Sequence, residues 1–403
     1  MAVEVADRNA ETVERVTGHS AVAYLSSLDG LRGIAILLVT WYHVPFLFRD
    51  DAGLPREMLE GTLQRVFWGM SLAGWVGVDL FFVISGLLIT SILLWSREVG
   101  SPLQVFWYRR GLRILPLAVL YLLILQVNTI LLDPLGVLKD FNGWLAYLFY
   151  AGNLHIALNG WQPIVVMILW SLAVEEQFYL VWPIVVHWFN RKALLMISLM
   201  MIALSPLARS LAYSFLDYPA VYVLTFCRLD ALASGAVIAL LISSETTKAQ
   251  TMSYCRRWSW LAFGILFVTF LGPFSPSFPQ TRPLMFTLFG YTWIAVAWAV
   301  LVGASLRCEG GVRSALSSRP LTFVGKRCYG FYLWHALMAG VVMKMVDALS
   351  VNIGFYGQLV LWLCALIAVA SLSWSCFERP ILRLKRLVPY SAPSQVRAIS
   401  LGA

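Results

Sequence analysis

Long runs of apolar residues recur along this chain from Leu28 to Phe377. A helix needs about 20 apolar residues to cross the hydrocarbon core of a bilayer, where every backbone N–H and C=O group must be paired within the protein. The chain of 403 residues is 60% apolar and 13% charged, whereas soluble proteins are about 45–50% apolar and about a quarter charged. The sequence therefore predicts an all-α polytopic membrane protein and excludes a soluble enzyme, a disordered regulator and a fibrous protein.

The apolar runs predict about ten transmembrane helices. One further segment, 142–158 (FNGWLAYLFYAGNLHIA), begins apolar but is broken by Gly152, Asn153 and His155. We interpret it as an interfacial or re-entrant helix, because an additional span there would invert the orientation of the neighbouring loops; eleven spans is the alternative. The ten predicted spans are approximately 28–48, 73–95, 111–132, 165–189, 193–213, 221–242, 259–272, 284–305, 328–346 and 357–377.

The Lys and Arg residues predict the orientation of these helices. Cytoplasmic loops of membrane proteins carry an excess of basic residues. Most of the 30 basic residues fall in loops that a ten-span arrangement places on one side, including the segment before the third span and the link at Arg191 and Lys192. We therefore predict that both termini are cytoplasmic, with a short tail (1–27), a membrane domain (28–380) and a basic tail (381–403).

Charge and cysteine content exclude several kinds of binding site. The formal net charge is +9, but no basic run alternates with aromatic residues, so we assign the excess to cytoplasmic loops and expect no nucleic acid. The six cysteines show no Cys-x-x-Cys pair and no zinc-ligand spacing, so we expect neither a metal site nor a disulfide framework. The Pro-rich segment 272–283 (GPFSPSFPQTRP) is expected to form an extended outer loop.

Arg32 and His43 lie in the first span, LDGLRGIAILLVTWYHVPF. Each charged group costs about 2.5–3.5 kcal/mol at the centre of a membrane helix, so each needs a reason. Arg32 and His43 are eleven residues apart, which places them on one helix face and separates them by about 16 Å. The structural alternatives are an interfacial anchor for Arg32 and a hydrogen-bonded packing role for His43. Because the two share a face, we favour a functional role.

The second span contains one charged residue, Asp79, in GWVGVDLFFVISGLL. Gly77 and Gly86 in the same segment would allow a neighbouring helix to approach closely. Asp79 is a candidate catalytic residue, with a structural role as a partner of Arg32, of His43 or of a helix N-terminus as an equal alternative.

The fourth predicted span contains two adjacent carboxylates, Glu175 and Glu176, in WSLAVEEQFYLVWP. They point about 100° apart on a helix, so one can face a cavity while the other contacts a neighbouring helix. Ser171 lies one turn before Glu175. Two carboxylates within an apolar run are difficult to explain by packing, and we treat both as candidate catalytic residues.

Arg110 and Arg113, in FWYRRGLRILP, are three residues apart and so present one face of a helix near its cytoplasmic end. Paired guanidinium groups suit bidentate binding of phosphate. From spacing alone, an ordinary basic flank that contacts anionic lipid is the stronger alternative.

Three other polar features are interpreted as structural. Arg228 and Asp230, in TFCRLDALASG, are predicted to form an ion pair with each other. His335, in CYGFYLWHAL, is predicted to be a packed or interfacial histidine, and His187 lies near an inner helix end.

The predicted depths place basic side chains at an inner mouth and His43 with the carboxylates deeper in the membrane. A neutral histidine oriented by a carboxylate can remove a proton from a hydroxyl group. Acyl transfer from a phosphorylated carrier to an alcohol fits this arrangement. A proton-coupled transporter also fits, because histidines and carboxylates serve as proton relays, and the residues alone favour it slightly. A non-catalytic scaffold would have no use for either group.

The motifs distinguish among these classes. SSLDGLRGIAILLVTWYH resembles the Arg-x10-His motif that opens the acyltransferase-3 family of integral-membrane O-acyltransferases. GVDLFFVISGLLIT, FWYRRGLRILP, WSLAVEEQFYLVWP, RLDALASGAV, YGFYLWH and the terminal FERP are similar to further segments of that family, in the family's order. The resemblance extends from about Leu28 to Pro380.

This resemblance implies a bacterial cytoplasmic-membrane enzyme that transfers an acetyl or other short acyl group from cytoplasmic acyl-CoA to a hydroxyl of a glycan or glycolipid. Acetyl-CoA is the expected donor. The absence of a following hydrolase-like domain from the sequence indicates the stand-alone form of the family. Acceptor, acyl length, oligomeric state and the choice between direct transfer and an acyl-histidine stay open.

The motifs also carry family roles onto particular residues. His43 corresponds to the essential histidine, and Arg32 is its motif partner. Arg110 and Arg113 match the arginine pair implicated with the CoA donor. Asp79, Glu175 and Glu176 match the family's acidic residues, one of which is expected to orient His43. Cys328 stands where a serine is common in the family.

Overall fold

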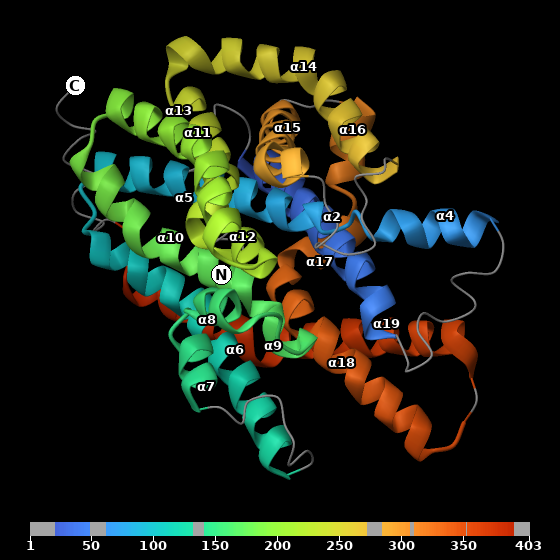
Figure 1. Cartoon of the computed structure of the whole chain (residues 1–403). Helices are drawn as coiled ribbons and strands as arrows, with labels where there is room; N and C mark the ends of the chain where they lie inside the picture. The colour runs from blue at the N-terminus through green and yellow to red at the C-terminus, as the bar shows by residue number, and fades with distance from the viewer. Residues whose placement is uncertain are drawn as a thin grey trace.

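The computed structural model describes residues 21–48, 62–131, 141–271, 284–306, 310–351 and 353–390. Over these ranges the chain is almost entirely helical and contains no β-strand (Figure 1). The predicted all-α character is therefore confirmed. The tail residues 1–20 and 391–403 and the Pro-rich loop 272–283 lie outside the described residues.

Twenty-two helical elements build the described part of the chain. In chain order they are α2 (Ala21–Leu47), α4 (Thr62–Ser71), α5 (Val76–Glu98), α6 (Leu103–Leu131), α7 (Phe141–Leu148), α8 (Gly152–Asn159), α9 (Ile164–Met167), α10 (Leu169–Trp188), α11 (Arg191–Phe215), α12 (Tyr218–Val223), η1 (Thr225–Cys227), α13 (Leu229–Ile242), α14 (Glu245–Leu271), η3 (Phe286–Gly290), α15 (Tyr291–Ser305), α16 (Gly310–Leu316), α17 (Arg319–Lys326), α18 (Cys328–Ala348), α19 (Gly354–Leu372), η4 (Ser373–Glu378), α20 (Arg379–Arg383) and η5 (Leu384–Leu387).

Seven helical segments in the described residues are long and apolar enough to cross a membrane, and they coincide with seven of the predicted spans. The other three predicted spans differ: 221–242 is divided among α12, η1 and α13, 259–272 falls at the end of the longer α14, and 328–346 falls in α18. The count of about ten is not confirmed, and the cytoplasmic location of both termini stays a prediction. The seven segments are Ser26–Leu47, Val66–Glu98, Leu103–Val127, Ile164–Trp188, Arg191–Phe215, Phe286–Ser305 and Gly354–Leu387.

The broken segment 142–158 forms two short helices, α7 and α8, instead of one. Tyr150 lies between them with a φ of 54°, a left-handed conformation that ends the first helix. Each helix has 8 residues and is only about 12 Å long, whereas the hydrocarbon core is about 30 Å thick. The segment is therefore not a single transmembrane helix; its position at the interface stays a prediction.

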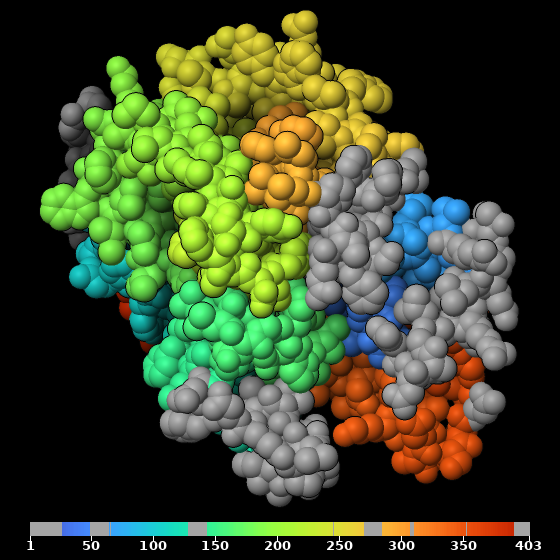
Figure 2. All heavy atoms as spheres, in the orientation of Figure 1, coloured from blue at the N-terminus to red at the C-terminus, as the bar shows by residue number. Residues whose placement is uncertain are grey.

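The centre of the molecule is formed by α5, which packs against α2, α10, α13 and α15. A Cβ added at Gly86 would lie 1.9 Å from the carbonyl oxygen of Leu232 in α13, and one added at Gly77 would lie 2.5 Å from that of Ala35 in α2. The prediction that these glycines allow close helix approach is confirmed. At the periphery, α14 runs along the upper edge, and α8 lies next to α12 (Figures 1 and 2).

Two buried ion pairs join α5, α11 and α13. Arg228 pairs with Asp79 at 2.6 Å, and Asp230 pairs with Arg209 at 2.9 Å. The predicted pair between Arg228 and Asp230 is therefore wrong. Arg228 is the residue before α13 and has a non-helical ψ of 2°, while Asp230 lies in the first turn of that helix. Residues two apart at a helix start do not face each other, so each finds a partner on another helix.

Candidate active site

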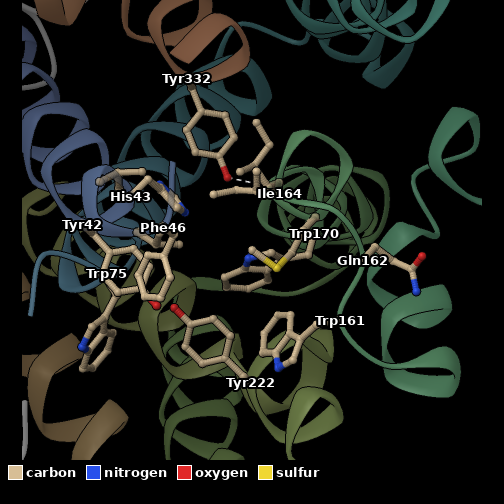
Figure 3. A pocket seen from close by; sticks show the side chains of 14 residues that line it. Tyr42, His43, Phe46, Trp75, Trp161, Gln162, Ile164, Trp170, Tyr222 and Tyr332 are labelled. Carbon is tan, nitrogen blue, oxygen red and sulfur yellow. Dashed lines mark hydrogen bonds between the residues drawn. The ribbon is translucent and has the colours of Figure 1, made fainter. Parts of the chain in front are cut away.

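A cavity of about 410 Å³ opens beside His43 of α2. Its wall is mainly aromatic and apolar, and Figure 3 shows the ring of His43 and the side chain of Tyr332 directed into it, opposite Trp161, Trp170 and Tyr222. The lining residues come from the first span, from α5, from the segment around α9 and from α12 and α18. We call this the aromatic cavity; it is large enough for part of a small-molecule or sugar ligand.

His43 is buried at the side of the aromatic cavity and contacts a second histidine. Its Nδ1 lies 3.2 Å from Nε2 of His335 in α18, and the two ring centroids are 4.9 Å apart. In the part of the chain that the structure describes, no carboxylate lies within 4.0 Å of either ring nitrogen of His43. The expected carboxylate partner is therefore replaced by an imidazole.

A second, smaller cavity of about 90 Å³ lies toward the predicted cytoplasmic side and is lined by basic residues. Arg32 comes from α2, while Arg110 and Arg113 come from α6. We call it the basic cavity. Arg32 contacts Asp29 at 3.2 Å on its own helix, and the guanidinium of Arg110 lies 4.8 Å from the ring centroid of Tyr179.

The basic cavity holds an excess of positive charge. Among the described residues, Arg110 and Arg113 form no salt bridge. The positive charges of Arg113, Arg110 and Arg109 repel the ammonium group of Lys385. Glu175 in the wall and Asp29 beside Arg32 offset only part of this positive charge. The remaining excess is suited to an anionic ligand with several phosphate groups.

The adjacent carboxylates of α10 face different surroundings, as predicted. Glu175 lines the basic cavity and accepts a hydrogen bond of 2.7 Å from the hydroxyl of Ser85 in α5. Glu176 does not line either cavity, and its Oε1 is buried without a hydrogen-bond partner among the described residues. Glu175 is thus the carboxylate that shares a site with the arginines.

The two cavities adjoin at Tyr332, which with Val78 lines both of them. The hydroxyl of Tyr332 donates to the carbonyl oxygen of Ile168 at 2.5 Å and lies 2.6 Å from Oγ of Ser171. A tyrosine hydroxyl has one proton, so Ser171 must be the donor in the second contact. Tyr332 therefore separates the basic cavity from the aromatic cavity.

The structure brings together some of the predicted site residues and separates others. Arg32, Arg110, Arg113 and Glu175 line the basic cavity, and His43 lines the aromatic cavity beside it. Asp79 lines neither cavity and is paired with Arg228.

Sequence reasoning missed two residues that the structure places at the site. His335 was assigned to packing, and Tyr332 was not singled out. The motif YGFYLWH places them three positions apart, which puts both on one helix face. That spacing was an available signal, but nothing in the sequence directed this face toward His43.

Comparisons with known proteins agree with the motif resemblance. A family model described as an acyltransferase domain matches residues 25–378. Peptidoglycan O-acetyltransferase OatA of Listeria monocytogenes is 28% identical over 393 residues, which cover 92% of this chain and 57% of that protein. The putative peptidoglycan O-acetyltransferase YrhL of Bacillus subtilis is 29% identical over 381 residues, covering 89% of this chain and 55% of YrhL.

A putative O-acetyltransferase of Staphylococcus aureus is 29% identical over 346 residues, covering 82% of this chain and 53% of the relative. The chain thus spans a little over half the length of the curated relatives it matches. No solved structure gives a significant match.

Proposed function

Because the chain belongs to the acyltransferase family whose model matches residues 25–378, we propose that it is a membrane O-acyltransferase that moves an acetyl or other short acyl group to a hydroxyl of a glycan. The family resemblance inferred from the motifs is confirmed by this match. The names of two relatives include peptidoglycan O-acetyltransferase, so peptidoglycan is the first acceptor to test. The observation that carries the proposal is the junction of a basic cavity with an aromatic cavity that contains a buried histidine.

The donor in this proposal is an acyl-CoA that enters from the cytoplasmic side. Its phosphates would bind Arg110 and Arg113, whose guanidinium groups have no carboxylate partners in the described residues. Lys385 and Arg32 add positive charge around the same space. The acyl-thioester arm would then extend past Tyr332 toward His43.

The acceptor in this proposal occupies the aromatic cavity. Aromatic faces are suited to the apolar faces of sugar rings, and polar tips such as the Gln162 amide and the Tyr222 hydroxyl can orient hydroxyl groups. Nε2 of His43 takes the proton of the acceptor hydroxyl while the oxygen attacks the thioester carbonyl. When the tetrahedral intermediate collapses, the carbon–sulfur bond breaks and the CoA thiolate takes the proton from His43. The products are an O-acyl ester and CoA.

The proposal is tested by measuring both products with purified protein, acetyl-CoA and a soluble peptidoglycan fragment. We expect wild-type protein to release CoA and acetylate the fragment in equal amounts. His43→Ala should lose at least about 100-fold in kcat, the lower range for loss of a general base. His187→Gln, at an exposed histidine of α10, is the matched control and should retain wild-type rates.

A second arm examines the donor separately. Arg113→Ala should raise the KM for acetyl-CoA at least about 10-fold, the loss of one charge-assisted contact, with the acceptor KM unchanged. Arg319→Ala, at an exposed arginine of α17, is the control. An unchanged KM for acetyl-CoA in Arg113→Ala would show that acyl-CoA does not bind in the basic cavity. Full activity in folded His43→Ala would overturn the proposed chemistry and would favour the proton-coupled transporter instead.

A further inference from the structure

The contact between His43 and His335 has a definite proton arrangement. Nδ1 of His335 lies 2.6 Å from the backbone carbonyl oxygen of Tyr332. A carbonyl oxygen can only accept a hydrogen bond, so Nδ1 of His335 carries a proton. His335 is fully buried, without a carboxylate partner among the described residues, and a charged imidazole would be costly there. The neutral ring then has an unprotonated Nε2.

This assignment determines the tautomer of His43. The unprotonated Nε2 of His335 lies 3.2 Å from Nδ1 of His43, so Nδ1 of His43 is the donor in this contact. The backbone of Val39, one turn earlier in α2, also hydrogen-bonds His43. In neutral His43 the Nε2 atom is consequently the unprotonated one. The ring of His43 lines the aromatic cavity.

The same contact also suits the protonated form of His43. An imidazolium donates from both nitrogens, so Nδ1 continues to donate to His335 after Nε2 has taken a proton. His335 accepts in both states and does not itself change protonation. The pair therefore requires no rearrangement when His43 takes a proton.

His335 is held in place by contacts that do not involve its imidazole. The indole Nε1–H of Trp362 in α19 donates to the backbone carbonyl of His335 at 2.9 Å. The side chain of Tyr332, one turn earlier in α18, is held by the carbonyl of Ile168 at 2.5 Å. A substitution of the His335 ring thus leaves the anchoring of α18 in place.

We propose that His335 is the positioning residue of this enzyme: it holds His43 in the tautomer whose unprotonated Nε2 faces the acceptor, and it accepts from Nδ1 throughout the reaction. This inference rests on the proposed function, because it takes His43 as the base. It differs from the expected arrangement, in which Asp79, Glu175 or Glu176 would orient His43.

The test compares His335→Gln with His335→Leu. A glutamine oxygen can replace Nε2 as the acceptor for Nδ1–H of His43, whereas leucine fills a similar volume without an acceptor. Loss of a residue that orients a reactive histidine costs about 10–100-fold. We expect His335→Leu to lower kcat by about that factor with both KM values unchanged, and we expect His335→Gln to recover most of the loss. Thermal unfolding of each detergent-solubilised variant verifies that it is folded.

The outcomes separate this inference from the proposed function. If His43→Ala is inactive and folded His335→Leu retains wild-type kcat, the positioning role is wrong and the proposed function stands. Equal losses in folded His335→Gln and His335→Leu would also overturn the role, because packing alone would explain them. If His43→Ala is active, the proposed function itself fails. His187→Gln serves as the common control.

Discussion

At the scale of single residues, the question is whether a buried charged residue stabilises the fold or takes part in catalysis. Arg228 is fully buried, and Asp79 lies 2.6 Å from it. The guanidinium also lies 4.6 Å from the ring centroid of Tyr291 and 5.1 Å from that of Tyr222, and aromatic faces stabilise a desolvated cation. Nε and Nη1 of Arg228 and Oδ2 of Asp79 have no hydrogen-bond partner among the described residues, but the short ion pair indicates that Asp79 acts as the counter-charge of Arg228.

We predict that Asp79→Asn lowers the free energy of unfolding by about 3–5 kcal/mol, the cost of leaving a buried charge unpaired. Replacing both partners together, Asp79→Leu with Arg228→Met, should cost less than either single change because no charge is left behind. Thermal unfolding in detergent measures this directly. A folded Asp79→Asn protein with wild-type stability and no activity would instead indicate that Asp79 is a catalytic residue.

At the scale of helices, the contact of α10 with α18 depends on a three-member hydrogen-bond chain. Ser171 donates to Tyr332, and Tyr332 donates to the carbonyl of Ile168 at the junction of α9 and α10. The two substitutions that break this chain are therefore not equivalent. Tyr332→Phe removes both hydrogen bonds of the chain and leaves the Ser171 hydroxyl without its acceptor, whereas Ser171→Ala leaves the tyrosine donating to Ile168.

We predict that Tyr332→Phe destabilises the protein by about 1–3 kcal/mol and Ser171→Ala by about 0.5–1.5 kcal/mol, because the first removes two hydrogen bonds and leaves the Ser171 hydroxyl unpaired, whereas the second removes one. The difference in melting temperature between the two variants is the measurement. An equal effect, or a larger one for Ser171→Ala, would contradict this direction of donation.

The close approach of α5 and α13 is a second property of the helices that can be tested. A Cβ at Gly86 would lie 1.9 Å from the carbonyl oxygen of Leu232, an atom of the backbone that cannot rotate away. We expect Gly86→Ala to cost more than about 3 kcal/mol, the upper end for overpacking a core, and to lower the folded yield.

Gly264→Ala in α14 is the matched control, since nothing lies within 4 Å of a Cβ added there. It should be neutral or stabilising by up to about 1 kcal/mol, because alanine favours the helix over glycine. Size-exclusion profiles and melting temperatures of the two variants provide the comparison. Similar behaviour of the two would show that α5 and α13 can move apart at little cost.

At the scale of the whole molecule, the proposed function requires the two cavities to open toward opposite sides of the membrane. Arg32 and His43 lie on one helix, α2, and their separation of eleven residues corresponds to about 16 Å. Arg32 lines the basic cavity and His43 the aromatic cavity. Donor and acceptor would then reach Tyr332 from opposite leaflets.

We predict that single introduced cysteines, one at the aromatic cavity and one at a predicted cytoplasmic position, are labelled from opposite sides of the membrane. The native cysteines are replaced in this variant. Gln162→Cys, at the aromatic cavity, should react with a membrane-impermeant maleimide in intact cells. Lys192→Cys, at the exposed start of α11, should react only after permeabilisation, because the basic residues predict a cytoplasmic position. Labelling of both cysteines from the same side would contradict the proposed paths of donor and acceptor.

The sequence by itself determined the helical membrane architecture, because apolar runs of this length leave the backbone no other way to pair its polar groups in lipid. Its motifs also determined the family, and helix periodicity placed Arg110 with Arg113 and turned Glu175 away from Glu176. All of these are local properties, since the direction of a side chain on a helix follows from its position within a few residues.

Only the tertiary structure decided which of these side chains meet. His43 and His335 are 292 positions apart, and Arg228 and Asp79 are 149 positions apart. The sequence assigned His335 to packing, paired Arg228 with Asp230 and predicted three spans that the described helices do not confirm. Contacts between helices depend on how closely and at what angle they cross, which the packing of all their faces decides together. The partner of a buried polar group is therefore a property of the assembled bundle and not of the segment that carries it.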